Sequence, residues 1–275
     1  MANNAPIGVF DSGVGGLTVV REIMRQIPNE TIIYFGDTAR VPYGSKSKQT
    51  IITYSRQIVK FLRMKGVKAI VIACNTASAL ALETVSKEVP IPVIGVVEPG
   101  AKVAAETTRN GRIGVIGTEA TINSGIYNIY LSKTNPNIKV YGKACPLFVP
   151  LVEEGWISDP ITMEVAKRYM SELKEYDIDT LVLGCTHYPL IRHTIGAVVG
   201  DKVTLVNPAY ETARTLKEVL ISKGLESTAP AGDHRFYVSD GAEKFQKFAN
   251  TILPCEVMET KDVNIESYAD KMEEI

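Results

Sequence analysis

Two cysteines stand where a thiol could take part in acid/base chemistry. Cys74 and Cys185 each follow a short apolar run and precede small polar residues, Asn75-Thr76 after one and Thr186-His187 after the other. If each run is a strand and each polar turn begins a helix, the helix N-terminus carries about half a positive charge and favours a thiolate. The side chains and backbone amides that follow each cysteine could also hold a carboxylate.

Two further side chains could assist these thiols. Asp11 ends the first apolar run and could cap the following helix, a role compatible with catalysis. His187 lies two residues after Cys185, where a histidine can equally be hydrogen-bonded packing. The stretch Gly13-Val-Gly-Gly lacks the spacing of a dinucleotide fingerprint, and the sequence contains no G-x-x-x-x-G-K-[ST] motif. We interpret these glycines as letting backbone amides approach a small anion.

The chain alternates apolar runs of strand length with segments of helical periodicity, which is typical of parallel sheets covered by helices on both faces. In its first part the predicted strands are 7–10, 31–35, 68–73 and 93–97, and the predicted helices are 17–27, 49–65 and 77–87. The alternation of strands and helices restarts at Arg112. Beyond 208 we expect a helix to 223, a polar loop over 224–233, a strand over 235–238 and a further helix after 241.

Three segments recur in the same order, which indicates two similar half-units. The repeat matches 7–12 with 113–118, 68–76 with 179–187, and 97–99 with 206–208. The offsets are 106 (from 7 to 113), 111 (from 74 to 185) and 109 (from 99 to 208). Buried strands resemble one another, so one match would carry little weight, but three in register with Cys74 on Cys185 favour duplication. We therefore expect an α/β fold of two pseudo-symmetric parallel-sheet domains that face each other across a central cleft.

Proline and glycine punctuate the chain at Glu98-Pro-Gly-Ala and again at Asn207-Pro-Ala. We place the domain boundaries there and expect the C-terminal tail to pack back on the first unit. The first α/β domain is then discontinuous, with residues 1–98 plus 208–275, and the second α/β domain covers 99–207.

Pseudo-symmetry would bring the two thiols into one crevice from opposite sides, because open α/β sheets bind ligands at the carboxyl ends of their strands. A thiolate on one face of a bound Cα could remove its proton while a thiol on the other face delivers one, giving the opposite enantiomer. Removing the Cα proton leaves a carbanion, which a dry site, helix N-termini and hydrogen bonds could stabilise without a cofactor. The two cysteines thus predict cofactor-independent interconversion of amino-acid enantiomers.

The composition indicates the class of protein, its partners and its cellular compartment. Of 275 residues, 45% are hydrophobic and 22% charged, which is ordinary for a soluble globular protein. The formal net charge of -1 gives no electrostatic reason to propose nucleic acid or a membrane as a partner. No secretion signal or membrane-spanning stretch is evident, and four cysteines without disulfide-scaffold density fit a reducing cytoplasm. We interpret Cys145 and Cys255 as small buried hydrophobes.

Four motifs resemble the glutamate racemases of the aspartate/glutamate racemase superfamily. They are Phe10-Asp-Ser-Gly-Val-Gly-Gly-Leu, Tyr34-Phe-Gly-Asp-Thr-Ala-Arg-Val-Pro-Tyr-Gly, Ala73-Cys-Asn-Thr-Ala-Ser-Ala and Gly184-Cys-Thr-His-Tyr-Pro-Leu. The resemblance runs along most of the chain. It implies glutamate as the small-molecule substrate, no cofactor, a homodimer, and a bacterial cytoplasmic setting in which D-glutamate is supplied for peptidoglycan synthesis.

The resemblance also implies residue roles. Cys74 would act on the D-enantiomer and Cys185 on the L-enantiomer, with Asp11 and His187 assisting. A glutamate after Val149-Pro-Leu-Val, Glu153 in preference to Glu154, would orient His187, although it could instead lie on a solvated helix face. The implied substrate contacts are Asp11, Ser12, Pro42, Tyr43, Gly44, Asn75, Thr76, Thr118, Thr121, Thr186 and His187.

Other hypotheses stay open at this point. An aspartate or hydantoin racemase would use the same two thiols on another substrate. A Cys–His hydrolase would use Cys185 and His187 and would not need Cys74. A metal site from Cys185, His187 and His193 matches no strong zinc spacing, and we expect no metal. A two-lobed binding protein would share the architecture but has no use for two thiols.

Overall fold

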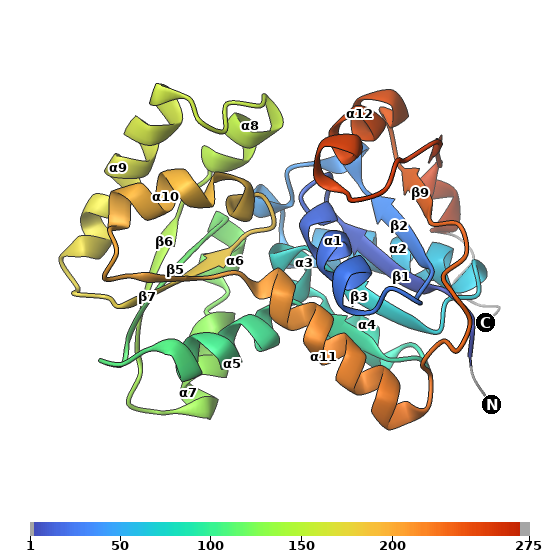
Figure 1. Cartoon of the computed structure of the whole chain (residues 1–275), viewed down its shortest axis with the longest axis horizontal. Helices are drawn as coiled ribbons and strands as arrows, with labels where there is room; N and C mark the ends of the chain where they lie inside the picture. The colour runs from blue at the N-terminus through green and yellow to red at the C-terminus, as the bar shows by residue number, and fades with distance from the viewer. Residues whose placement is uncertain (1–2, 270–275) are drawn as a thin grey trace.

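The computed structural model describes residues 3–269 and contains two parallel β-sheets that lie side by side (Figure 1). The first sheet has six strands in the order β10-β9-β2-β1-β3-β4. All residues of its three central strands, β2, β1 and β3, are buried, as expected when helices cover both faces of a sheet. The strands are β1 (Ile7–Asp11), β2 (Ile32–Gly36), β3 (Ala69–Ile72), β4 (Val93–Gly95), β9 (Arg235–Val238) and β10 (Thr260–Asp262).

The second sheet has four parallel strands in the order β6-β5-β7-β8. They are β5 (Arg112–Gly117), β6 (Lys139–Ala144), β7 (Thr180–Gly184) and β8 (Thr204–Val206). Its order repeats that of β2-β1-β3-β4 in the first sheet, so β5 corresponds to β1 and β7 corresponds to β3. The two cysteines that follow β3 and β7 therefore occupy equivalent positions. The expected fold class, two facing parallel-sheet α/β units, is confirmed.

Helices cover both faces of the first sheet because successive strand residues point to opposite sides. Val9 packs in a core with α1, α11 and α12, whereas Phe10 packs in a second core with α2, α3 and α4. These helices are α1 (Leu17–Gln26), α2 (Lys48–Met64), α3 (Asn75–Leu80), α4 (Leu82–Lys87), α11 (Pro208–Lys223) and α12 (Ala242–Ile252).

The second sheet is covered in the same way. One face packs against α5 and α7, and the other packs against α8, α9 and α10. The helices of this lobe are α5 (Val97–Thr107), α6 (Glu119–Asn123), α7 (Ile126–Thr134), α8 (Phe148–Glu153), α9 (Pro160–Lys174) and α10 (Arg192–Val199). Short 3-10 turns are η1 (Thr38–Arg40), η2 (Tyr43–Ser45), η3 (Tyr188–Ile191) and η4 (Ile265–Tyr268).

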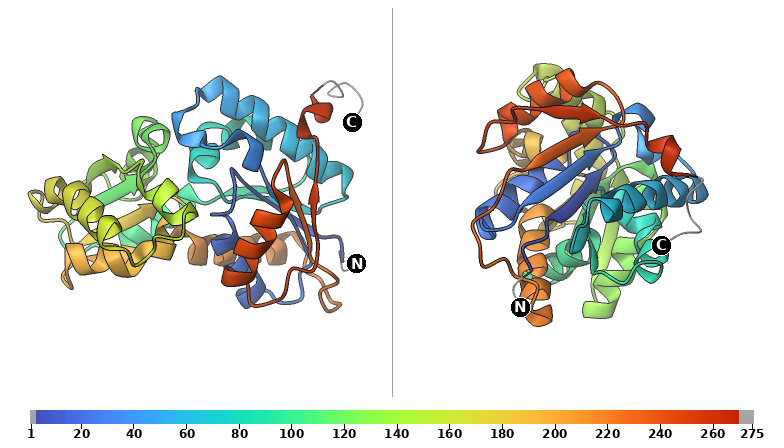
Figure 2. Two further views of the ribbon diagram at one scale, coloured as in Figure 1. Left: turned by 90° about the horizontal axis from the view of Figure 1, so that it is seen from above. Right: turned by 90° about the vertical axis from the view of Figure 1, so that its right-hand side faces the viewer.

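The chain passes between the two sheets at α5 and α11, which contact each other. Both crossings lie along the side where the lobes meet, with α11 also packed on α1 (Figures 1 and 2). The expected boundary at 98/99 falls inside the first turn of α5, and the boundary at 207/208 falls at the start of α11. The division into 1–98 plus 208–275 and 99–207 stays a prediction, although β9 and β10 do join the first sheet.

Two expected elements differ in their ends. The helix expected over 77–87 begins at Asn75 and is interrupted at Ala81, whose φ of -118° is not helical. The strand expected over 93–97 ends at Gly95, because Val97 already begins α5. Pro99 sits in the first turn of that helix, where the missing amide costs no helical hydrogen bond. Proline therefore marks a helix start here rather than a linker.

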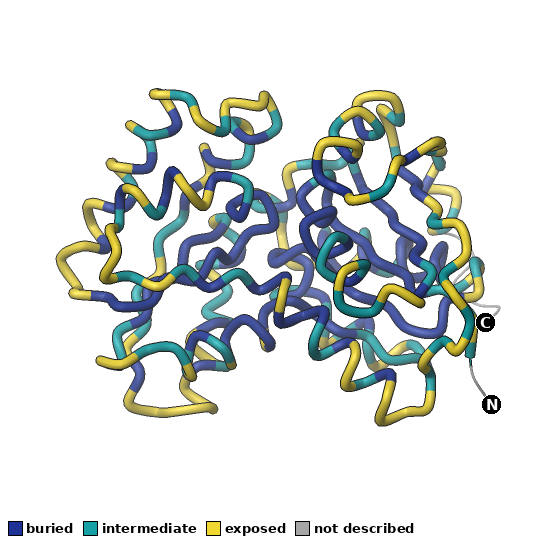
Figure 3. The backbone as a smooth tube through the Cα atoms, in the orientation of Figure 1, coloured by how far each residue is buried: buried dark blue, intermediate teal, exposed yellow. Residues whose placement is uncertain are grey.

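Burial is deepest along the strands and at the junction of the two lobes, whereas the outer helix surfaces are exposed (Figure 3). None of the helices within residues 3–269 combines the length and the apolar character needed to cross a bilayer. The carboxyl ends of β1, β3, β5 and β7 lead into the loops that line the junction, and these loops carry the site.

Candidate active site

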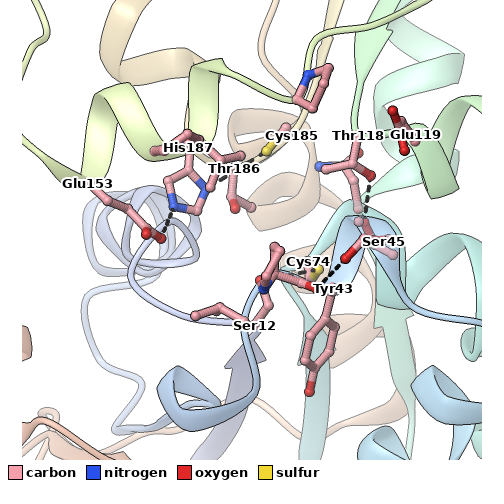
Figure 4. Close-up of a pocket in the computed structure, with 18 residues that line it drawn as sticks. Ser12, Tyr43, Ser45, Cys74, Thr118, Glu119, Glu153, Cys185, Thr186 and His187 are labelled. Carbon is pink, nitrogen blue, oxygen red and sulfur yellow. Dashed lines mark hydrogen bonds and ion pairs between the residues drawn. The ribbon is translucent and has the colours of Figure 1, made fainter.

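A pocket of about 310 Å³ lies between the two lobes and receives side chains from both (Figure 4). Most of the residues expected to contact substrate line it, and they come from the ends of strands in each sheet. The expected residues that line the pocket are Ser12, Pro42, Tyr43, Gly44, Cys74, Asn75, Thr76, Thr118, Glu153, Cys185, Thr186 and His187.

Cys74 follows β3 and is the N-cap residue of the short helix α3. Its side chain is buried, and its thiol donates to the Ser12 hydroxyl across 3.8 Å. Burial, and then the negative charge of Asp11, raise the pKa of this thiol to about 12, although the Ala77 amide and the Ser12 hydroxyl act in the opposite direction. The amide of Ala77 at this helix end lowers the pKa, as expected, but burial outweighs it and the net pKa is raised.

Cys185 follows β7 and is paired with a histidine that is paired in turn with a carboxylate. Its sulfur lies 3.8 Å from Nδ1 of His187, and Nε2 of His187 lies 3.0 Å from Oε1 of Glu153 on α8. Burial alone would lower the pKa of His187, but the hydrogen bonds with Cys185 and Glu153 raise it to about 10. Glu154, the other carboxylate considered, is exposed, and it is Glu153 that reaches the imidazole.

The electrostatics of Glu153 match this arrangement. Burial raises the pKa of its carboxyl, but the hydrogen bond and the positive charge of His187 outweigh burial, with help from Lys244, so the net pKa is lowered. Glu153 is therefore ionised and His187 positively charged at neutral pH. The geometry therefore places an imidazolium beside the Cys185 sulfur on one side of the pocket and a protonated thiol, Cys74, on the other.

Asp11 lies behind the pocket wall and not in it. Its carboxylate accepts from the Gly13 amide at 3.1 Å and from the Thr186 hydroxyl at 3.3 Å. Burial raises its pKa, while the charge of His187 opposes that change. It does not cap α1, whose N-cap residue is Gly16. The Gly13 amide therefore donates to the Asp11 carboxylate, whereas we expected the amides of this turn to approach an external small anion.

The glycines of this turn are needed for close packing, Gly15 against the other lobe and Gly16 within its own lobe. A Cβ on Gly15 would lie 2.3 Å from Oγ1 of Thr186 and 2.6 Å from Nδ1 of His187. A Cβ on Gly16 would lie 2.5 Å from Cβ of Asp11. The turn after β1 is therefore packed at Gly15 against the turn that carries Cys185.

Hydroxyl and amide groups also join the lobes beside the pocket. Thr76 on the first lobe contacts two threonines of the second, Thr118 at 2.9 Å and Thr121 at 3.2 Å, and these two lie 3.0 Å from each other. The Tyr127 hydroxyl donates to Oδ1 of Asn75 at 2.7 Å. Thr121 and Asp11 are the two expected substrate contacts that reach the pocket only through neighbours that line it.

A buried carboxylate anchors the segment that includes Pro42, Tyr43 and Gly44. Asp37 is fully buried and accepts from the Tyr43 hydroxyl, from Nε of Arg40 at 2.8 Å and from the Ser239 hydroxyl at 2.9 Å. Since Ser239 follows β9, this network ties the pocket wall to the C-terminal part of the first sheet.

Sequence reasoning missed several residues of the site. Ser45 and Glu119 directly follow Gly44 and Thr118, so extending the motifs by one residue would have found them. The apolar lining carries no chemical signature in the sequence; it consists of Val41, Pro146, Val149 and Pro150.

The remaining cysteines and histidines lie apart from the pocket. Cys145 is buried and Cys255 is half-buried, and neither lines the site. His193 is exposed on α10 and does not line the pocket with Cys185 and His187. Across residues 3–269 there is no group of three or more His, Cys, Asp or Glu side chains arranged to hold a metal ion.

Known proteins resemble this chain over nearly its full length. Residues 7–216 match the family model described as Asp/Glu/Hydantoin racemase. A glutamate racemase from Geobacter metallireducens is 50% identical over 262 residues, covering 95% of this chain and 97% of that protein. The crystal structure of glutamate racemase isoform RacE1 from Bacillus anthracis matches with a TM-score of 0.92 at 40% identity, covering 95% of this chain and 98% of that one. A glutamate racemase from Francisella tularensis subsp. tularensis, solved in complex with D-glutamate, matches with a TM-score of 0.90 at 44% identity, covering 96% and 99%.

Proposed function

As the chain belongs to the Asp/Glu/Hydantoin racemase family and is an amino-acid racemase, we propose that it interconverts L- and D-glutamate by proton transfer at Cα between Cys74 and Cys185. One observation carries the proposal. Two thiols at equivalent strand ends of the two sheets face one pocket from opposite lobes (Figure 4). Glutamate is favoured over aspartate or a hydantoin by relatives such as the F. tularensis glutamate racemase, which was solved with D-glutamate.

In the L-to-D direction, the Cys185 thiolate removes the Cα proton and becomes a thiol. The electron pair left on Cα is delocalised into the α-carboxylate, and Cys74 then gives its proton to the opposite face and becomes a thiolate. The reverse direction exchanges the two roles. The charges of the pocket suit the first step, because His187 is cationic beside Cys185 while the high pKa of Cys74 keeps that thiol protonated.

The remaining residues support these two transfers in our proposal. Glu153 keeps His187 charged and oriented, and Asp11 with Ser12 surrounds Cys74. Substrate carboxylates and the ammonium group are held by the polar lining, for which we propose Ser12, Pro42, Tyr43, Gly44, Asn75, Thr76, Thr118, Thr186 and His187, with Asp11 and Thr121 acting from behind it. No step in this mechanism needs a cofactor.

Solvent exchange at Cα tests the proposal directly. In D2O the wild type is expected to incorporate deuterium into both glutamate enantiomers. Cys74→Ser should lose racemisation by about a thousandfold but still exchange the Cα proton of L-glutamate, because Cys185 can remove and return a proton on one face. Cys185→Ser should show the mirror-image result with D-glutamate. Cys255→Ser, outside the pocket, is the control.

Two results would count against the two-thiol mechanism. If Cys74→Ser kept most of the racemase activity, Cys185 and His187 would be acting without a second thiol. If either serine variant exchanged both enantiomers, a single base would reach both faces of Cα. Measuring L-aspartate alongside L-glutamate by circular dichroism decides the substrate, and faster racemisation of aspartate would contradict our choice.

We also propose the cellular role that the family implies, supply of D-glutamate for peptidoglycan in a bacterial cytoplasm by a homodimer. Loss of the gene should then make growth depend on added D-glutamate. Light scattering of the purified protein should give twice the mass of one 30.0 kDa chain. Growth without D-glutamate, in a strain with no second source of it, would contradict the cellular role, and a mass of one chain would contradict the dimer.

A further inference from the structure

One buried tyrosine outside the four motifs contacts both cysteine-bearing turns. Tyr127 lies in the first turn of α7 on the second lobe and is almost fully buried. Its hydroxyl donates across the lobe junction to Oδ1 of Asn75, the residue directly after Cys74. Its ring packs against Gly184, the residue directly before Cys185, where an added Cβ would lie 3.3 Å from Cε2 of the tyrosine.

The direction of the Tyr127 hydrogen bond has a consequence for Asn75. Burial raises the pKa of the phenol above its ordinary value of 10, so at neutral pH it keeps its proton and remains a donor. A donor demands an acceptor, so the Asn75 oxygen faces the tyrosine. The NH2 group of the same amide must then point the other way.

That NH2 group is free to act on a ligand. Within residues 3–269 the side-chain nitrogen of Asn75 donates to no protein acceptor, and it is not among the side-chain atoms sealed inside the protein without a partner. Asn75 itself lines the pocket. An amide that presents two N–H donors attracts a carboxylate, whereas the flipped amide would present an oxygen and repel it.

We propose that Tyr127 is a positioning residue that fixes the orientation of the Asn75 side chain, so that this amide offers hydrogen-bond donors to an anionic substrate. The proposal rests on the proposed function, because glutamate is the anion concerned. It adds a residue that no motif contains, and it explains why a polar phenol is buried at this junction.

Steady-state kinetics of Tyr127→Phe test the proposal. Removing the phenolic oxygen removes the hydrogen bond that holds the amide with its NH2 group toward the ligand, and the loss of one such bond corresponds to about tenfold in ligand affinity. We expect KM for both enantiomers to rise by about tenfold, with kcat changed by less than about threefold, because neither thiol is touched. The pH dependence of kcat should stay as in the wild type.

A matched control and a double variant separate positioning from packing. Tyr188→Phe also removes a buried phenol donor, the one bound to the Cys145 carbonyl at 2.8 Å, and should lower stability without raising KM. In an Asn75→Ala background, Tyr127→Phe should cause no further rise in KM, since it acts through the amide. An unchanged KM in Tyr127→Phe, or fully additive effects in the double variant, would overturn the proposal.

A second measurement does not depend on activity. A wild-type crystal structure at a resolution that reveals hydrogens should show the NH2 group of Asn75 facing the pocket, and an oxygen there would overturn the proposal. If instead the amide has this orientation but wild-type enzyme exchanges no Cα proton of glutamate, the proposed function fails while the orientation stands.

Discussion

Replacing Glu153 by Gln probes the chain that runs from Cys185 through His187 to Glu153. The substitution keeps the shape and one hydrogen bond at 3.0 Å but removes the negative charge. A hydrogen bond to a charged partner contributes about 1.5–3 kcal/mol, and a change of one in pKa corresponds to about 1.4 kcal/mol. We therefore expect the pKa of His187 to fall by about 1 to 2 from its value of about 10.

The consequence for stability has a definite sign. Because the pKa of His187 in the folded protein lies above its ordinary value of 6.5, the pairing stabilises the fold fully below about pH 6.5. This stabilisation is lost as the pH rises through about 10. The difference in unfolding free energy between wild type and Glu153→Gln should therefore be largest near neutral pH and should shrink in alkaline solution.

Nuclear magnetic resonance titration of ring-labelled histidines measures the pKa change, and urea unfolding at pH 7 and pH 10.5 measures the stability change. Glu154→Gln is the matched control, since Glu154 is the exposed neighbour and does not reach the imidazole. A His187 pKa that stays near 10 in Glu153→Gln would refute the reasoning. An equal decrease in Glu154→Gln would show that general charge, not this contact, sets the pKa.

Three further variants address the surrounding structure. Asp37→Asn leaves the buried guanidinium of Arg40 without its charged partner, so it should destabilise the fold by about 3–5 kcal/mol and raise KM. Urea unfolding measures the loss of stability, and a change below about 1 kcal/mol would contradict this prediction. Gly15→Ala should abolish measurable racemisation, because its Cβ would lie 2.3 Å from Oγ1 of Thr186. Gly13→Ala should keep most activity, because its Cβ would lie no nearer than 3.3 Å to Val41 and 3.9 Å to Oε1 of Glu153. Asp11→Asn should lower the pKa of the Cys74 thiol and so speed its alkylation by iodoacetamide at pH 8, which mass spectrometry measures. An unchanged alkylation rate would show that the Asp11 charge does not act on this thiol.

Much of the site could be predicted because its signals are local in the sequence. Each cysteine sits between an apolar run and a polar turn, and these few residues determine the end of each strand. The helix expected directly after the cysteine is found at Cys74, where α3 begins, whereas Cys185 is followed by a turn and the 3-10 segment η3. The repeat then related Cys74 to Cys185 without any structural information, and the equal strand orders of the two sheets agree with it. Glu153 was expected only from the family resemblance, which placed a glutamate after the apolar helical segment that forms α8.

The features that could not be predicted depend on how the two lobes meet. The contacts of Tyr127 with Asn75, and of Thr76 with Thr118 and Thr121, join residues that are 42 to 52 positions apart, and no periodicity encodes such pairs. The pKa of Cys74 was expected to be lowered by its helix end, but the outcome depends on burial, which only the assembled fold determines. Helix ends such as the break at Ala81 were missed because apolar periodicity continues through them.

The three threonines at the lobe junction form a closed ring of hydroxyls. Each of Thr76, Thr118 and Thr121 carries one proton to donate, and in each of the three contacts either oxygen can be the donor. The three hydrogen bonds can therefore point in either direction around the ring, and all three hydroxyl protons can reverse together with no movement of a heavy atom. Thr76 and Thr118 line the pocket, so this wall can change which of its hydroxyls donates a hydrogen bond without any side chain moving.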